Sequence, residues 1–236
     1  TLLGFETKST LAKPTPELIA LFGASPSVAG VSVTPDNAMR CPTVFGCVKV
    51  ISESIAQLPL ILYRRNGAEK ERASDNPLYA LLHDQPNDWT SSYEFRLSMQ
   101  AAKCLHGNAF AYINRSGGRI VELIQIPSSS VTVETDSATM EPAYMVAQGN
   151  GQRRRYSREE IFHLHSLGTS TNAGLSPVHL MREAIGLSIA MEEHAARIFG
   201  SGARPGGVFK YAKTLGPEAM KRLRASFESS HGGGVN

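Results

Sequence analysis

The sequence predicts an α+β fold in which helices pack on a mostly antiparallel sheet. In its first half, two segments repeat apolar residues every three or four positions, which is the period of a helix with one buried face. Five short segments rich in strand-forming residues follow, separated by Gly, Pro or Ser. Helices grouped ahead of a run of adjacent strands are typical of an α+β layer.

The N-terminal residues, 1 to about 38, differ in composition from the rest of the chain. Pro, Ser, Thr and Gly are scattered through them, with one short apolar patch, Leu18 to Phe22. A segment of this kind buries little surface. We therefore expect an extended arm, and a mobile terminus is one interpretation of it.

The first helix is expected to run from Thr43 to Pro59. Apolar residues recur in it at spacings of three and four, and we expect the face that they form to be buried. They are Val44, Val48, Ile51, Ile55 and Leu58. Pro59 stops the helix, because proline cannot continue the hydrogen-bond ladder. The next run, Leu60 to Tyr63, is expected to be a strand ahead of a turn at Asn66-Gly67.

The second helix is expected to begin at Ser91 and end at Gly107. Ser91 and Glu94 have the spacing of a capping box, in which each side chain accepts a hydrogen bond from the other residue's backbone N–H. Behind them, apolar residues repeat at Phe95, Met99, Ala102 and Leu105. Gly107 favours the left-handed conformation that commonly ends a helix.

Five strands and two further helices are expected after Gly107. The strands span residues 109–114, 120–126, 131–134, 143–147 and 160–164. A long helix is expected from Ser176, a good N-cap residue, with Pro177 at its first position, through to Gly200 or Gly202. The last helix begins near Pro217, and its narrow apolar stripe is Met220, Leu223 and Phe227.

The composition indicates a globular protein and argues against several classes. The chain has 236 residues, 42% of them hydrophobic, and a formal charge of +3. This excess of positive charge falls well short of the concentrated face of a dedicated DNA-binding protein. Three cysteines, an odd number, favour a reducing compartment, and we expect Cys41, Cys47 and Cys104 to be small buried hydrophobic residues. No apolar run approaches the roughly 18 residues of a membrane span.

His163 and His165 form the pair that best suggests catalysis. They lie two apart on an expected strand, so both rings could point to one side and share a metal. Such a site needs further His, Asp or Glu ligands and a catalytic acid, and no motif supplies them. We interpret both as structural, and a metal-dependent hydrolase that uses His163 and His165 is kept as an alternative. The sequence predicts no catalytic residue, no metal ligand and no cofactor.

The densest positive cluster is Arg153 to Arg155 with Arg158, and it could hold phosphate groups by charge alone. Glu159 and Glu160 follow it directly, and Tyr156 is its one aromatic residue. These neighbours favour a solvated face or an intersubunit salt-bridge face over a nucleic-acid site. No glycine cluster has the spacing of a nucleotide-binding P-loop.

Five short signals occur in order along the chain. They are CVKVISESIAQLP from Cys47 to Pro59, Asn76-Pro77-Leu78-Tyr79 followed by Pro86-Asn87, Gly107-Asn108-Ala109-Phe110-Ala111, Ile161-Phe162-His163, and Gly174-Leu175-Ser176-Pro177. In this order and spacing they resemble the portal proteins of tailed bacteriophages and of phage-derived gene-transfer particles. The resemblance runs from about Met39 to about Ser229.

The resemblance implies a subunit of a ring, typically of twelve copies, at one capsid vertex, through which double-stranded DNA is packaged and ejected. In that family, residues 1–40 would be an N-terminal arm that could lie on a neighbouring subunit. Residues 41–212 would be the wing, and residues 213–236 the first stem helix up to the start of the clip. The clip, the second stem helix and the crown look absent. The implied role is that of a structural head-to-tail connector without catalysis.

The same resemblance implies partners and a location. Besides further copies of the chain, the partners are the major capsid protein, the terminase motor, tail or adaptor proteins, and DNA that passes without sequence specificity, with no membrane. The location is the portal vertex of a virion or phage-like particle assembled in the bacterial cytoplasm. Residues that could face the channel or another subunit are Lys213, Lys221, Arg222 and Arg224. Another head or neck adaptor protein is a further alternative.

Overall fold

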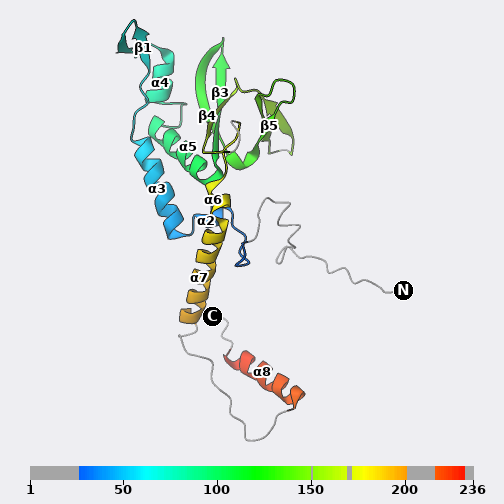
Figure 1. The fold of residues 1–236 in the computed structure, drawn as a ribbon. Coiled ribbons are helices and arrows are strands. Elements are labelled where there is room, and N and C mark those ends of the chain that lie inside the picture. The colour runs from blue at the N-terminus through cyan, green and yellow to red at the C-terminus, as the bar shows by residue number, and fades with distance from the viewer. Residues whose placement is uncertain (1–26, 150, 169–171, 201–215, 232–236) are drawn as a thin grey trace, which may run out of the picture. The chain divides into compact units, whose positions relative to one another are not determined.

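The computed structural model describes residues 27–149, 151–168, 172–200 and 216–231, and the chain divides into two units after Ser188 (Figure 1). The helices are α2 (Pro35–Ala38), α3 (Pro42–Ala56), α4 (Pro77–His83), α5 (Ser92–His106), the 3₁₀ turn η1 (Ser128–Ser130), α6 (Pro177–Leu180), α7 (Arg182–Gly200) and α8 (Pro217–His231). The strands are β1 (Tyr63–Asn66), β2 (Glu69–Arg72), β3 (Asn108–Ser116), β4 (Arg119–Ile126), β5 (Val131–Thr135), β6 (Pro142–Ala147), β7 (Arg153–Tyr156) and β8 (Ile161–His165). The predicted α+β fold class is confirmed.

The described strands of the first unit form three antiparallel sheets. Two have three strands each, in the orders β4-β3-β8 and β5-β6-β7, and the third is the β1–β2 hairpin. The five strands predicted after Gly107 are confirmed as β3, β4, β5, β6 and β8, with ends shifted by one or two residues. In Figure 1, β3 and β4 run side by side next to α5.

Strand β3 lies at the centre of the core because both of its faces are buried. Ala109 and Ala111 share a cluster with Met99 of α5, while Phe110, which points the other way, packs against Tyr144 of β6. This alternation follows from the two-residue period of a strand. Burying a side chain as large as Phe110, which is 2% exposed, contributes about 2 kcal/mol. One strand therefore joins the helical layer to the second sheet.

Helix α5 forms as its sequence predicts. The Ser91 side chain accepts a hydrogen bond from the Glu94 N–H, and the Glu94 carboxylate accepts one from the Ser91 N–H. The helix ends at Gly107, whose φ of 76° is left-handed. Both ends thus satisfy backbone groups that a helix otherwise leaves unpaired.

Helix α3 packs on α5 through small residues. Its buried positions are Val48, Ser52 and Ala56, spaced four apart along one stripe. The Arg96 guanidinium of α5 donates two hydrogen bonds to the Ala56 carbonyl, at 2.8 and 3.1 Å. Because the last carbonyls of a helix have no partner within it, Arg96 fixes the end of α3 against α5.

The prediction that the apolar face of α3 is buried is wrong for most of that face. Ile51, Ile55 and Leu58 are 47%, 44% and 62% exposed. Cys47 is also exposed, whereas Cys41 is buried and Cys104 is half-buried, so the expectation of three buried cysteines holds only in part. The buried stripe is rotated toward the smaller residues, which allow α3 to approach α5 closely.

Some elements were misplaced or missed by the sequence pattern. The strand expected at Leu60 to Tyr63 begins only at Tyr63, and its residues pair with β2, with Arg64 opposite Glu71. The turn expected at Asn66-Gly67 is confirmed as the hairpin loop, with Gly67 at a φ of 62°. Strands β2 and β7 and helices α2 and α4 were not predicted.

The single long helix expected from Ser176 is two helices. Ser176 caps α6 through a hydrogen bond from the His179 N–H, as predicted, but the chain leaves helical geometry at Met181, where ψ is 12°. Helix α7 then runs to Gly200, one of the two expected ends. No glycine or proline marks the break, so the sequence carried no local signal for it.

The ends of the chain are described in part. In the second unit, α8 begins at Pro217 as predicted, and Met220 and Leu223 of its stripe are exposed. Residues 27–38 of the expected arm include α2 and the buried Val33 and Ala38. The boundary expected near residue 212 lies outside the described residues, so the division into arm, wing and stem stays a prediction. No described helix is long and apolar enough to cross a membrane.

Candidate functional site

Three segments distant in sequence meet where α5 passes into β3. Gly107 lies so close to the segment before α6 that a Cβ atom there would fall on the Leu175 carbonyl. The Gly107 carbonyl accepts a hydrogen bond of 2.8 Å from the Ser166 N–H, just after β8. Glycine is required here both for the left-handed φ and for this close backbone approach.

Asn108 is the central residue of this junction. Its amide nitrogen donates to the Gly174 carbonyl and its amide oxygen accepts from the Gly174 N–H, both at 2.8 Å. The same oxygen lies 3.0 Å from Nε2 of His163. One asparagine therefore holds β8 and the segment before α6 against β3.

Ser176 links the same segment to α5. Its hydroxyl donates to the Leu105 carbonyl at 2.9 Å and accepts from the His179 N–H at 3.2 Å. The predicted role of Gly107, Asn108, Ser176 and Pro177 as residues that set helix and strand boundaries is confirmed. What the sequence did not show is that the two pairs of residues contact each other.

His163 is held as a neutral ring whose two nitrogens both have partners. Because the Asn108 oxygen is identified by its bond to the Gly174 N–H, Nε2 of His163 must donate to that oxygen. Nδ1 then accepts from the Tyr144 hydroxyl at 3.3 Å, and the ring stacks on Phe110. Burial, assisted by the nearby His165, lowers the pKa of His163 to about 4.

This arrangement leaves His163 without a lone pair for a metal. The rings of His163 and His165 are neighbours, 5.5 Å between centroids, so the prediction that they share a side is correct. Nδ1 of His165, however, pairs with the Ser166 carbonyl. Among the described residues, no group of three or more His, Cys, Asp or Glu side chains could hold a metal ion. The hydrolase alternative therefore has no metal-binding geometry at this pair.

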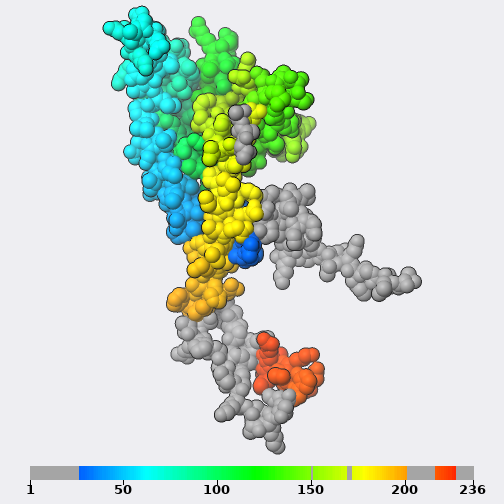
Figure 2. All heavy atoms as spheres, viewed as in Figure 1, coloured from blue at the N-terminus to red at the C-terminus, as the bar shows by residue number. Residues whose placement is uncertain are grey.

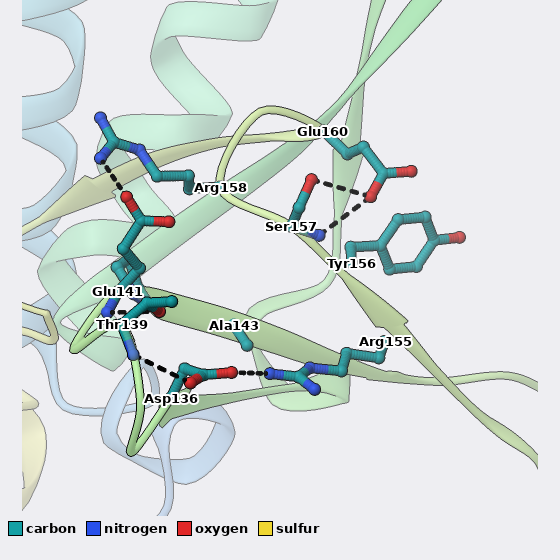
Figure 3. A pocket seen from close by; sticks show the side chains of 10 residues that line it. Asp136, Thr139, Glu141, Ala143, Arg155, Tyr156, Ser157, Arg158 and Glu160 are labelled. Carbon is teal, nitrogen blue, oxygen red and sulfur yellow. Dashed lines mark hydrogen bonds and ion pairs between the residues drawn. The ribbon is translucent and has the colours of Figure 1, made fainter.

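Arg155 and Arg158 of the arginine cluster line a pocket of about 440 Å³ beside strands β6 and β7 (Figure 3). Arg155 binds Asp136 at 2.7 Å, and Arg158 binds Glu141 at 3.1 Å. Hydrogen bonds from the Ala138 N–H and from Arg155 lower the pKa of Asp136 to about 2. The carboxylate is thus ionised at any physiological pH and stays a partner for Arg155.

The charge of the arginine cluster is neutralised in part by ion pairs of Arg155 and Arg158 within the chain. Arg154 lies over the ring of Tyr156, 4.7 Å from its centroid. Because Arg155 and Arg158 pair with carboxylates of the same unit, the cluster offers less positive charge to a phosphate group than its sequence suggests. The salt bridges of Arg155 and Arg158 lie within one chain, and the predicted intersubunit salt-bridge face stays a prediction.

Comparison with known proteins identifies the family. The family model described as phage portal protein matches residues 42–236. The chain belongs to the phage portal protein family. It is 29% identical over 208 residues to the portal protein of Enterobacteria phage HK97, covering 86% of this chain and 48% of that protein. It is 28% identical to the probable portal protein of Streptomyces phage phiC31, covering 88% of this chain and 47% of that protein.

Solved structures show the same fold. A chain in the neck of an empty GTA particle matches with a TM-score of 0.63 at 24% identity, covering 94% of this chain and 64% of that one. An HK97-family phage portal protein from Corynebacterium diphtheriae matches with a TM-score of 0.59 at 15% identity, covering 86% and 63%. The chain spans about half the length of the two curated portal relatives it matches.

The signal made of Asn76 to Tyr79 and Pro86-Asn87 has a structural reason in this chain. Asn87 is buried and donates its side-chain amide to the Leu123 carbonyl of β4 at 2.8 Å, while the Leu123 N–H donates to the Pro86 carbonyl. Asn76 caps α4 by accepting from the Leu78 N–H. Asn87 thus joins the loop before α5 to β4, whereas Asn76 fixes the start of its own helix. Tyr144, the partner of His163, belongs to none of the five sequence signals and was missed.

Three of the four cations proposed for the portal stem lie on α8. Lys221, Arg222 and Arg224 are exposed on that helix, and Lys221 pairs with Glu218 one turn earlier, at 3.6 Å. Lys213 lies outside the described residues. The structure brings the three described cations onto one short segment and leaves their role as a prediction.

Proposed function

We propose that this chain is the wing and first stem helix of a portal subunit that forms a ring at one capsid vertex. In this proposal, double-stranded DNA passes through the ring during packaging and ejection. Membership of the portal family, with the match over residues 42–236, is the observation that carries the proposal. Relatives titled portal protein and likeness to chains of GTA particle necks, one of them computed with C12 symmetry, support it.

Exposed apolar residues on the helices support an assembly of several copies. On α7, Leu187, Met191 and Ile198 are 54%, 62% and 45% exposed, and their spacings of four and seven place them on one stripe. Water is a poor environment for such a stripe, and neighbouring copies in a ring would cover it. A ring closes when one face of each subunit binds a different face of the next.

The proposed role is structural. Each of the two nitrogens of His163 has a hydrogen-bond partner within the junction, which supports a structural role for this residue. The junction instead fixes the start of α6 to α5 and β3. A rigid connection between these elements suits a subunit that must keep its shape within an assembly.

The proposed partners follow from the family. They are further copies of the chain, the major capsid protein, the terminase motor and tail or adaptor proteins, with assembly in the bacterial cytoplasm. Lys213, Lys221, Arg222 and Arg224 would approach the channel or a neighbouring subunit. DNA must slide past them, so weak phosphate contacts suit the task better than strong ones, which would add up around a ring.

Negative-stain electron microscopy of the purified gene product tests the proposal. Rings with a central hole wide enough for a DNA duplex are expected, and end-on views would give the subunit number. A population made only of monomers or dimers, under conditions that permit assembly, would refute it. Metal analysis of the same sample is the control for the hydrolase alternative, because that alternative requires a stoichiometric metal ion.

A further inference from the structure

An open apolar groove of about 290 Å³ lies in the first unit between α3, the end of α5 and the α6–α7 break. Figure 2 shows these segments meeting on one face, with α3 in light blue beside α6 and the start of α7 in yellow. Thr43 aside, the lining residues are apolar or cysteine, and they include Cys47, Ile51, Cys104, Met181 and Ile185.

The walls of this groove are not covered by the described residues. Met181 is 61% exposed and Ile51 is 47% exposed. Ile51 belongs to the face of α3 that the sequence predicted to be buried, and Met181 lies at the unpredicted break between α6 and α7. An exposed apolar hollow of this kind marks a place where another apolar segment binds.

The described chain begins close to the groove. Ser27 is buried against Gly186, where an added Cβ would meet the Ser27 side chain, and the Val28 N–H donates to the Glu183 carboxylate at 2.8 Å. Ile185, which lines the groove, is the residue before Gly186. Residues 1–26 therefore connect to the body of the protein next to one wall of the groove.

The sequence of residues 1–26 contains a segment of matching chemistry. Its longest apolar run is Leu18 to Phe22, within which Leu18, Leu21 and Phe22 have the spacing of one helical face. Four residues, 23–26, separate Phe22 from Ser27. An extended chain of that length reaches about 17 Å, and so short a tether gives an effective concentration in the millimolar range.

We propose that residues 18–22 bind in this groove of their own chain, with their apolar side chains against Ile51, Met181 and Ile185. The tether makes a chain's own segment outcompete that of another chain at micromolar protein concentration. The segment covers the exposed walls of the groove in the free subunit. This proposal stands whether or not the chain forms a ring.

The thiol of Cys47, which is exposed and lines the groove, is a natural reporter. Alkylation by N-ethylmaleimide, followed by peptide mass spectrometry, would be compared between the unmodified protein and a Leu18→Asp, Phe22→Asp double variant. We expect the variant to react at least about tenfold faster at Cys47, because charged residues leave the apolar groove. A Thr7→Asp, Ser9→Asp double variant, which adds the same charge to residues 1–26 but outside the 18–22 segment, is the matched control and should react like the unmodified protein.

A disulfide experiment identifies whose segment occupies the groove. A Phe22→Cys variant, oxidised at low micromolar concentration, is expected to bond to Cys47 or Cys104 within one chain, at a yield that does not change on dilution. Disulfide-linked dimers in place of this product would show that a second copy supplies the segment and would overturn the proposal. Unchanged Cys47 reactivity in the Leu18→Asp, Phe22→Asp variant would overturn it as well.

Discussion

Replacing Asn108 by alanine tests whether the junction stabilises the wing. Asn108→Ala removes two hydrogen bonds to Gly174 and one to His163. At about 1 kcal/mol net for each, the free energy of unfolding should fall by about 3 kcal/mol. For a protein of this size that corresponds to a decrease in Tm of about 6 to 12 °C.

The assay is urea unfolding followed by circular dichroism, with Asn114→Ala as the matched control. Asn114 lies on the same strand, and its side-chain amide makes one hydrogen bond, to Glu122 at 2.8 Å. The control should cost less than about 1 kcal/mol. Equal shifts of the urea midpoint in the two variants, at unchanged m-value, would show that Asn108 has no special role.

A second variant at the same position checks the chemistry. Asn108→Asp loses the donor to Gly174 and places a carboxylate beside Nε2 of His163, which raises the pKa of that ring. A raised folded pKa adds stability at low pH that is lost as pH increases. The destabilisation by Asn108→Asp should therefore be smaller at pH 5 than at pH 7, whereas that by Asn108→Ala should not follow this trend.

Three further predictions concern other residues, two of them in the same junction. Gly107→Ala should destabilise the protein by more than about 3 kcal/mol in thermal unfolding, because the added Cβ meets the Leu175 carbonyl. Gly117 has a φ of 57° but lies in open space, so Gly117→Ala should cost only about 1 kcal/mol. The depressed pKa of His163 contributes stability that is present above pH 6.5 and lost as pH falls toward 4. The free energy of unfolding should therefore fall by about 1 kcal/mol between pH 7 and pH 5, after a discount for solvent screening. The His163→Gln variant should not show this fall. Arg222→Glu with Arg224→Glu, in the protein at its native length, should lower DNA packaging more than Arg153→Glu with Arg154→Glu, and equal packaging yields would remove α8 from the channel.

The parts of the fold that the sequence predicted are those with local signals. Helix α5 was placed within a residue because Ser91, Glu94 and Gly107 determine its ends through their own backbone and side-chain bonds. Strand β7 was missed because Arg153 to Arg155 show no apolar alternation, and it exists by pairing with β6. The break between α6 and α7 at Met181 was missed because no Gly or Pro marks it in the sequence. Those elements depend on tertiary contacts that a local pattern does not contain.

In the junction, too, the sequence predicted the features with local signals and missed those that depend on tertiary contacts. Gly107, Asn108, Ser176 and Pro177 were recognised as boundary residues, because glycine, cap residues and N-terminal proline have local conformational reasons. That Asn108 contacts Gly174 could not be seen, since the two residues are joined only by the folded sheet. The partner of His163, Tyr144, lies on another sheet and has no spacing relation to it in sequence.

The bonds between Asn108 and Gly174 also have a consequence for the order in which the chain folds. They join residues 66 positions apart, so the entropy of closing that long loop must be overcome before either bond can form. The local α5 cap and the β3–β4 hairpin need no such closure and can form earlier. Contacts completed after the transition state mainly control unfolding, so weakening the junction should speed the opening of the wing while leaving its refolding rate nearly unchanged.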